Sequence, residues 1–402
     1  MPSTLTDVPD LTRPEFWQAD PYPTLHWLRA NAPVFWHELP DRPPFWAITR
    51  YDDIVSISKN PEVFSSARGL VMSESTDPEY MAPSMVRMDD PLHKWMRSLV
   101  SKGFTPPRIR ELEGYIRSLT TDILDSVSDR GEVEFVTEVA ALLPVYVIGE
   151  MLGVPREDQH LIKEWSDATA EVSDDGELTE RGKTAFVEMM QYLAAMQDAR
   201  IKTPTDDLVS LLLTAEVDGR KLTIDEQQGF FQLLEFAGNE TTRNSIAGGV
   251  HALGAEHPEE KDRLIEDPSL VPSAVEEILR YVTPVTHFKR TVMSDTEVRG
   301  EALSEGEELI LFYSAGNRDP EVFPNPDAFD IGRRPNPQIA LGGGGPHFCL
   351  GASLGRLEMR VMFEELIRRF PDFEVVGPIE RPMSNFIRGI QSMPVKLGSD
   401  HG

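Results

Sequence analysis

The only cysteine of the chain, Cys349, follows a glycine run and precedes a stretch with helical spacing. The run comprises Gly342–Gly345. Open amides in such a loop and the dipole of the following helix favour the thiolate form of cysteine, which is both a nucleophile and a metal ligand. A nucleotide-phosphate loop is disfavoured, because neither Gly-x-Gly-x-x-Gly spacing nor a Gly-Lys-Ser/Thr ending is present. A small core hydrophobe is the alternative for a lone cysteine, and the glycines beside it argue against that.

A second candidate lies in the middle of a long stretch with helical spacing, from Ile224 to about Ala255. Thr223 and Glu226 form a capping box, which predicts where the helix begins. At a rise of ~1.5 Å per residue, roughly 30 residues cross a domain of this size, so we expect the helix to run through the core. Its middle, Phe236–Thr242, gives up local helix propensity, which is typical of a functional segment.

Within that segment an acid and a hydroxyl are adjacent, Glu240 and Thr241. In a dry site such a pair can pass a proton inward and hold ordered water. The alternative is that these residues only bend the helix.

Two charged pairs are spaced by about one helical turn. His93 and Arg97 can reach the same pair of anions, with a solvated surface pair as the alternative. Glu277 and Arg280 have the spacing of an ordinary surface ion pair, which is the simplest interpretation when they are taken in isolation.

Taken together, these segments resemble the cytochrome P450 family. The Cys349 loop is similar to the family's haem-ligating segment, Phe-Gly-x-Gly-x-His-x-Cys-x-Gly, although it is one residue longer and has Leu341 at the aromatic position. The match extends from about Asp20 to the end of the chain. Four other segments match the family's motifs. Ala237–Thr242 resembles the oxygen-activating segment of the central helix, and Glu277–Arg280 resembles the Glu-x-x-Arg motif. Pro326–Arg333 resembles the meander that completes the ion cluster of that motif, and His93–Arg97 resembles the propionate-binding His-x-x-x-Arg.

The resemblance implies a haem b cofactor, iron protoporphyrin IX, with Cys349 as the iron ligand. Glu240 and Thr241 would relay protons to bound dioxygen, whereas Glu277 and Arg280 would be structural. The propionates would be held by four basic residues, His93, Arg97, Arg290 and His347. The remaining cofactor contacts implied by the resemblance are Ala237, Gly238, Leu341, Gly342 and Gly351.

The implied activity is that of a monooxygenase that hydroxylates an unactivated C–H bond of a lipophilic small molecule with O2. The extra glycine and the segment Ala237–Asn244 resemble a subgroup, mostly from mycobacteria and their relatives, that hydroxylates the chain ends of sterols and methyl-branched lipids. A sterol, branched fatty acid or terpenoid is therefore the expected substrate. The resemblance assigns the pocket walls to Leu70–Met88, Leu233, Leu234, Val285–Phe288, Phe386 and Ile387, with His287 as a bystander.

Electrons must come from a separate protein, because the chain contains no flavin or nicotinamide fingerprint. A ferredoxin with its ferredoxin reductase is the expected source. Complementary charge steers such partners, and a basic patch could serve here. Its candidate residues are Lys102, Arg108, Arg110, Arg356 and Arg360, for which plain solvation of helix faces is the alternative.

The composition excludes several other classes. The 402 residues carry a formal net charge of −28, which repels nucleic acid and anionic lipid. A single cysteine excludes an internal disulfide and zinc sites built on several thiolates. No apolar run approaches the ~18 residues that span a bilayer, and no signal pattern opens the chain, so we expect a cytoplasmic protein without stable membrane insertion.

The spacing of apolar residues predicts a mainly α fold with a minor β part (α+β). The resemblance implies the cytochrome P450 fold, a triangular helical domain around a buried haem. We expect a single catalytic domain over residues 1–402, because no repeat or long linker divides the chain. Residues from about 1 to 70, together with C-terminal strands, would form the β-rich part, and residues from about 71 to 370 the helix-rich part. Long helices are expected over 109–127, 136–152, 181–201, 271–281 and 350–370.

Three alternatives to the monooxygenase remain at this stage. A haem-thiolate sensor or carrier, or an enzyme that uses peroxide directly, would need no proton relay, so Glu240 and Thr241 argue against both. A serine esterase is a remote alternative, because Gly351–Gly355 fits Gly-x-Ser-x-Gly. That motif requires a preceding strand and a later histidine, and the only later one is His401 in the tail.

Overall fold

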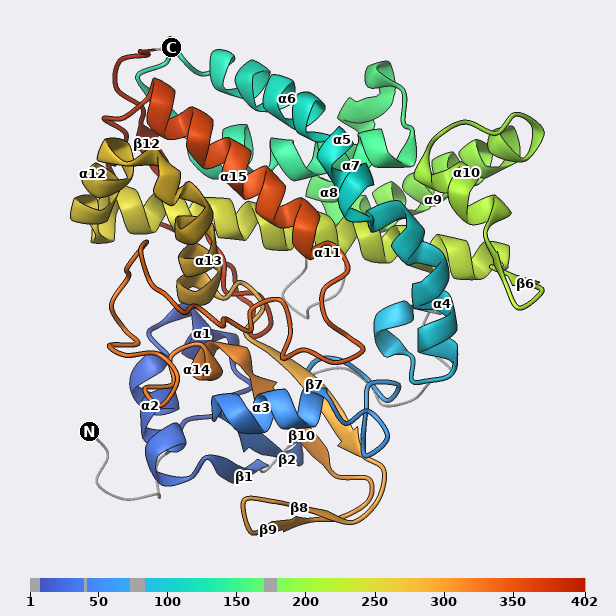
Figure 1. Ribbon diagram of the computed structural model, residues 1–402, viewed down its shortest axis with the longest axis vertical. Coiled ribbons are helices and arrows are strands. Elements are labelled where there is room, and N and C mark those ends of the chain that lie inside the picture. The colour runs from blue at the N-terminus through green and yellow to red at the C-terminus, as the bar shows by residue number, and fades with distance from the viewer. Residues whose placement is uncertain (1–7, 40–41, 73–83, 170–178, 402) are drawn as a thin grey trace.

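The computed structural model describes residues 8–39, 42–72, 84–169 and 179–401 (Figure 1). Helices dominate, as predicted, and the strands are few and short. The α-helices are α1 Pro14–Gln18, α2 Tyr22–Asn31, α3 Tyr51–Ser58, α4 Leu92–Val100, α5 Pro106–Glu111, α6 Glu113–Asp125, α7 Leu142–Leu152, α8 Gln159–Thr169, α9 Glu180–Lys202, α10 Leu208–Thr214, α11 Ile224–His251, α12 Pro258–Glu266, α13 Val271–Val282, α14 Tyr313–Gly316 and α15 Ala352–Arg369.

Within the described residues, the strands form one larger sheet and three small ones. The larger sheet has the order β1-β2-β10-β7-β3, in which β10 pairs parallel with β2 and the other pairs are antiparallel. The strands are β1 Val34–Leu39, β2 Arg42–Ile48, β3 Phe64–Ser65, β4 Glu132–Glu134, β5 Glu216–Val217, β6 Arg220–Lys221, β7 His287–Val292, β8 Thr296–Val298, β9 Glu301–Leu303, β10 Glu308–Phe312, β11 Glu374–Val375 and β12 Pro394–Lys396.

The expected division into β-rich and helix-rich parts needs a correction. The C-terminal strands β11 and β12 pair with β4, outside the larger sheet. The N-terminal strands pair instead with β7 and β10, which lie within the stretch expected to be helix-rich. Apolar faces of β2 and β10 explain this pairing, because Ala47, Ile310 and Phe312 are fully buried against the first helices.

The long central helix forms as predicted. Thr223 and Glu226 make both hydrogen bonds of the capping box, and α11 continues without interruption to His251. In Figure 1, α11 crosses the whole molecule, with α15 and α6 on one side and the larger sheet on the other. A π-helical turn, η7 Ala252–Glu256, extends it to the end of the expected range. The helix therefore holds residues of its middle at the centre of the fold.

Two expected helices are divided in the structure. The stretch 109–127 is shared between α5 and α6, which meet at Leu112. The stretch 136–152 begins with a π-helical turn, η5 Val136–Ala140, before α7. Pro144 explains the second irregularity, because it has no N–H to donate to the preceding turn. The remaining short helical turns are η3 Met85–Arg87, η4 Ser101–Phe104, η6 Arg156–Asp158 and η8 Pro268–Leu270.

No helix in the described part of the chain is both long enough and apolar enough to span a membrane.

Candidate functional site

The loop that carries Cys349 is a tight cradle built on glycine. Gly342, Gly344 and Gly345 have φ values of 99°, 84° and 77°, a region that glycine adopts without strain. A Cβ at Gly345 would lie 2.3 Å from the carbonyl oxygen of Ser58, so the loop approaches the end of α3 closely. The Cys349 N–H closes the cradle by donating to the Leu341 carbonyl at 2.9 Å. The glycines thus fix the position of the thiol just before α15.

The Cys349 thiol has no disulfide partner and remains accessible. Burial nevertheless raises the pKa of the thiol above its ordinary value, while the Gly351 N–H, Arg97 and Arg356 act in the opposite direction. The expectation that loop amides and the helix dipole would favour the thiolate is therefore only partly met, because desolvation outweighs them. A bound metal cation would supply what is lacking, since a thiol that coordinates a metal is deprotonated.

Four basic side chains from three parts of the chain gather beside this loop, and we call His93, Arg97, Arg290 and His347 the basic cluster. The rings of His93 and His347 lie 4.1 Å apart. Arg97 donates to the Phe348 carbonyl at 2.6 Å, which joins α4 to the loop. Arg290 is buried on β7. The tertiary fold therefore brings together all four residues that the sequence analysis assigned to one clamp.

The basic cluster is incompletely satisfied. The Nε2 atoms of His93 and His347 are buried without a hydrogen-bond partner among the described residues. Burial, followed by the charges of Arg290, His93 and Arg97, lowers the pKa of His347 to about 3. Buried polar atoms in native proteins are normally paired. These unpaired nitrogens beside two arginines have the chemistry of a site for carboxylates.

The middle of α11 carries the predicted acid and hydroxyl. The Thr241 hydroxyl donates to the Ala237 carbonyl at 2.7 Å, so it fills the helix groove without breaking the helix. Glu240 is mostly buried and accepts from Arg243 at 2.6 Å and from the side-chain amide of Asn244 at 3.3 Å. Sequence reasoning missed these two partners, although their i+3 and i+4 spacing from Glu240 was available as a signal.

Gly238 serves close packing. A Cβ there would lie 2.4 Å from the Ile148 side chain, so the glycine lets α7 approach α11. Local flexibility is not needed to explain its presence, because the helix is continuous through this position.

A buried carboxyl that the sequence analysis did not identify connects α15 to α11. Glu358 is 2% exposed and hydrogen bonds to the side chain of Thr242. Burial raises the pKa of Glu358 to about 8, although the bond to Thr242 opposes the shift. A Cβ at Gly355 would lie only 3.6 Å from the Thr242 hydroxyl, so the start of α15, just after Cys349, contacts α11 beside Thr241.

A second buried acid lies earlier on α11. Burial raises the pKa of Glu235 to about 7, the nearby Glu240 carboxylate adds to the shift, and a hydrogen bond from Ser166 opposes it. An acid between apolar neighbours was the available signal in the sequence.

The Glu-x-x-Arg motif forms a fully satisfied ion cluster, which we call the α13 ion cluster and which consists of Glu277, Arg280 and Arg333. Glu277 and Arg280 are fully buried and form two hydrogen bonds, at 2.7 and 2.8 Å. Arg333 donates to both Glu277 carboxylate oxygens at 3.1 Å. The remaining Arg280 donors reach backbone carbonyls. The pair is thus part of the core, and the surface interpretation is wrong.

Part of the expected substrate wall is described. Val285 forms a β-bridge with Ile387, and the Phe288 and Phe386 rings lie 5.5 Å apart. His287 is fully buried, and both of its ring nitrogens are hydrogen bonded, to Thr286 and to the Met72 N–H, which agrees with a bystander. Of the segment Leu70–Met88, residues 73–83 lie outside the described residues.

The expected basic patch is largely neutralised. Arg356 pairs with Glu276, Arg360 with Glu113 and Glu364, and Arg108 with Asp206. Lys102 and Arg110 form no such pair with another described residue, so they are the candidates that remain from the expected patch.

The esterase alternative fails on geometry. Ser353 lies within the first turn of α15, and the residues before it form a loop with no strand. The His401 N–H donates to the Arg369 carbonyl at the other end of that helix.

Known proteins share the sequence and the fold of this chain. A sequence model described as Cytochrome P450 matches residues 173–386. The methyl-branched lipid omega-hydroxylase of Mycobacterium tuberculosis is 40% identical over 389 residues, which cover 92% of this chain and 89% of the relative. The steroid C26-monooxygenase of the same organism is 40% identical, with 92% of each chain covered. The structure of Mycobacterium marinum cytochrome P450 CYP268A2 in complex with pseudoionone has a TM-score of 0.89 at 36% identity and covers 97% of this chain and 98% of that one.

These similarities define an enzyme of the oxidoreductase class. The chain belongs to the cytochrome P450 family and is a P450 monooxygenase, so the resemblance inferred from its motifs is confirmed, as is the fold.

The residues present fit the haem cofactor of this family. A single free thiol offers the axial ligand, and the unpaired nitrogens of the basic cluster offer partners for two carboxylates. A Cβ at Gly351, two residues after the thiol, would meet no other atom within 4 Å, so there is open space on this side of the loop.

Proposed function

We propose that the protein is a haem-thiolate monooxygenase that hydroxylates an unactivated C–H bond of a lipophilic small molecule, with O2 as the oxygen source. The observation that carries this proposal is the meeting of a lone accessible thiol, an unsatisfied basic cluster and an acid–hydroxyl pair around the centre of one helix. When bound, haem b with a thiolate ligand supplies the oxygen-activating chemistry.

In this proposal Cys349 is the iron ligand. His93, Arg97, Arg290 and His347 hold the propionates through charge-assisted hydrogen bonds. Backbone contacts with the cofactor come from the loop and from the middle of α11. Those remaining cofactor-contact residues are Ala237, Gly238, Leu341, Gly342 and Gly351.

The proton-handling residues are Thr241 and Glu240. The Thr241 hydroxyl can release its bond to Ala237 and hold ordered water, while Glu240 exchanges protons within the network of Arg243 and Asn244. Both partners donate to the Glu240 carboxylate and hold it in place beside Thr241.

The substrate is a sterol, a branched fatty acid or a terpenoid. Support comes from the names of the relatives at 40% identity, which act on methyl-branched lipids and on steroids, and from the apolar wall around Val285, Phe288 and Phe386. Apolar walls of this kind suit a lipophilic ligand. Ferredoxin and ferredoxin reductase supply the electrons, and the enzyme acts in the cytoplasm.

The proposal is tested by reconstituting the purified enzyme with a ferredoxin and its reductase and then titrating sterols, branched fatty acids and terpenoids. We expect at least one class to perturb the haem spectrum and to give a product with one added oxygen. Loss of all product with every class, despite a reducible haem, would leave a sensor or carrier as the better description.

The relay assignment has its own test in Thr241→Ala. The variant should consume reductant at a rate close to that of the wild type but couple it to product about a hundredfold less efficiently, which is the lower end of what a general-acid step contributes. Thr184→Ala, at an exposed site on α9, is the matched control. Unchanged coupling in Thr241→Ala would show that the hydroxyl has no part in proton delivery.

A further inference from the structure

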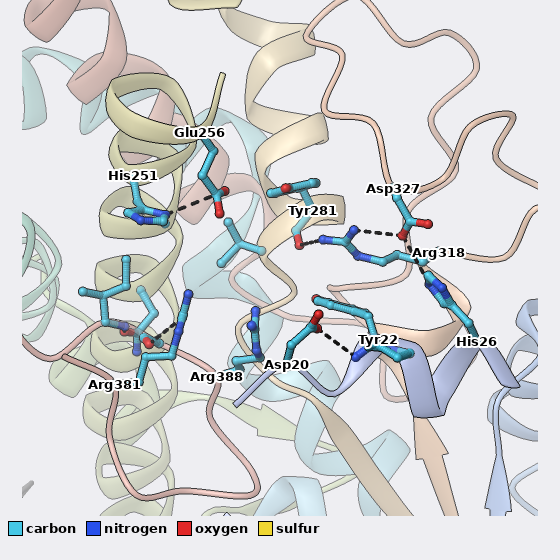
Figure 2. Close-up of a pocket in the computed structure, with 16 residues that line it drawn as sticks. Asp20, Tyr22, His26, His251, Glu256, Tyr281, Arg318, Asp327, Arg381 and Arg388 are labelled. Atoms are coloured by element: carbon cyan, nitrogen blue, oxygen red, sulfur yellow. Dashed lines mark hydrogen bonds and ion pairs between the residues drawn. The ribbon is translucent and has the colours of Figure 1, made fainter. Parts of the chain in front are cut away.

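A cavity of about 500 Å³ lies between α2, α11, α13 and the segment 381–390, and many of the residues that line it are charged. Figure 2 shows that Arg381 and Arg388 enter it side by side from this segment and point in the same direction, toward His251 and Glu256. None of the residues assigned to the haem site lines this cavity.

Neither of these two arginines has a carboxylate partner among the described residues. Arg381 donates to the Gly389 carbonyl at 3.1 Å. The guanidinium carbon of Arg388 lies 5.2 Å from the centre of the Tyr22 ring. The Nε atom of Arg388 is buried and has no hydrogen-bond partner among the residues that the structure describes. The chain has 67 acidic residues for 39 basic ones, so unpaired neighbouring arginines cannot be explained by a shortage of carboxylates.

The acidic residues of the cavity contact other residues of its wall, and only Glu256 acts on Arg381 as an opposite charge, without an ion-pair contact among the described residues. Asp327 pairs with Arg318 at 3.1 Å and with His26 at 3.2 Å. Glu256 lies 3.7 Å from His251. Asp20 accepts from the Tyr22 N–H at 3.1 Å.

The two arginines act on one another as like charges, and the charges of Tyr22 and Glu256 only partly offset this. Burial and the neighbouring charge of Arg388 lower the pKa of Arg381 to about 10. Burial alone would raise the pKa of Tyr22, but the charges of Arg318 and Arg388 hold it below its ordinary value. An anion placed between the arginines would remove this repulsion and satisfy the open donors.

We propose that this cavity is a binding site for a small multiply charged oxyanion, of the phosphate or polycarboxylate class, held by Arg381 and Arg388. Paired guanidinium groups match the oxygens of both classes. The inner wall includes Asn244, whose amide also bonds Glu240, so an occupant would lie one side chain from the proposed proton-handling acid.

The test is calorimetric titration of the full-length holoenzyme in a chloride buffer of constant ionic strength, with inorganic phosphate, succinate and acetate as separate probes. We expect saturable one-to-one binding of phosphate, of succinate or of both, and weak or no binding of acetate. Binding of phosphate alone or of succinate alone identifies the source, and binding of both assigns a general oxyanion site. No saturable heat with phosphate or succinate would overturn the proposal.

The variants Arg388→Gln and Arg381→Gln should each weaken binding about tenfold or more, because each removes a charged hydrogen-bonding partner. Arg13→Gln, at a side chain that is 62% exposed and outside the cavity, is the matched control and should bind as the wild type does. If all three variants bound phosphate or succinate with the affinity of the wild type, the result would contradict the proposed site. If a glutamine variant fails to fold, Arg388→Lys retains the charge, and it should show weakened but measurable binding. The readout does not depend on turnover, so it stays independent of the proposed monooxygenase function.

Discussion

The α13 ion cluster and the basic cluster are both groups of buried charged residues, but they differ in how completely they are paired. In the α13 ion cluster the Glu277 carboxylate receives Arg280, Arg333, the Asn336 side chain and the Asp330 N–H. In the basic cluster, by contrast, the Nε2 atoms of His93 and His347 lack partners in the described chain, and burial and the nearby arginine charges lower the pKa of His347. The comparison indicates that a hydrogen-bond network whose polar atoms are all paired stabilises the fold, whereas a network with unpaired polar atoms indicates a binding site for a ligand.

The largest effect is expected from breaking the completed network. Glu277→Gln leaves Arg280 and Arg333 buried without a countercharge, which should cost about 3–5 kcal/mol of unfolding free energy. Denaturant unfolding measures this. The control is Glu276→Gln on the same helix, which removes a partly exposed pair with Arg356 and should cost less than about 1 kcal/mol. Equal losses of unfolding free energy in the two variants would contradict the stabilising role of the α13 ion cluster.

The incomplete network should respond differently. His347→Leu removes an imidazole whose Nε2 has no partner among the described residues, so the fold should persist, while haem retention should drop about tenfold through the loss of a hydrogen bond to a propionate. Haem content per protein and far-ultraviolet circular dichroism measure the two effects. A variant that loses helical structure together with haem would mean that His347 is architectural.

Glu358 is a buried acid whose hydrogen-bond partner, the Thr242 hydroxyl, is neutral, in contrast to the two arginines that pair with Glu277. We therefore expect a smaller effect on stability from this group, and one that depends on pH. Its pKa of about 8 lies above the usual value of 4.5, so between these pH values the folded state holds a proton that the unfolded chain has released. Stability from this group is therefore present at low pH and is lost as the pH rises toward 8. Glu358→Gln should flatten the fall in Tm between about pH 5 and about pH 9. An unchanged slope would contradict the assignment.

The sequence analysis was most successful where chemistry is local. The capping box of α11 and the structural Glu277–Arg280 pair implied by the resemblance lie in short segments, and the structure contains both. The pairing of Thr242 with Glu358 and of β2 with β10 joins residues separated by more than a hundred positions. Such contacts depend on tertiary packing, which no spacing rule encodes. Arg381 and Arg388 were missed for the same reason, because the cavity that makes them notable is closed by α2 and α11.

The central claim is that Cys349 binds the iron of a haem as a thiolate. The most direct measurement is the absorption spectrum of the reduced, carbon monoxide-treated protein, for the wild type, for Cys349→Ser and for Ser353→Ala as a control on the following helix. We predict the red-shifted band of a thiolate-ligated haem in the wild type and in Ser353→Ala, and its loss in Cys349→Ser. Purified wild type without haem, or a serine variant that keeps the band, would contradict the claim.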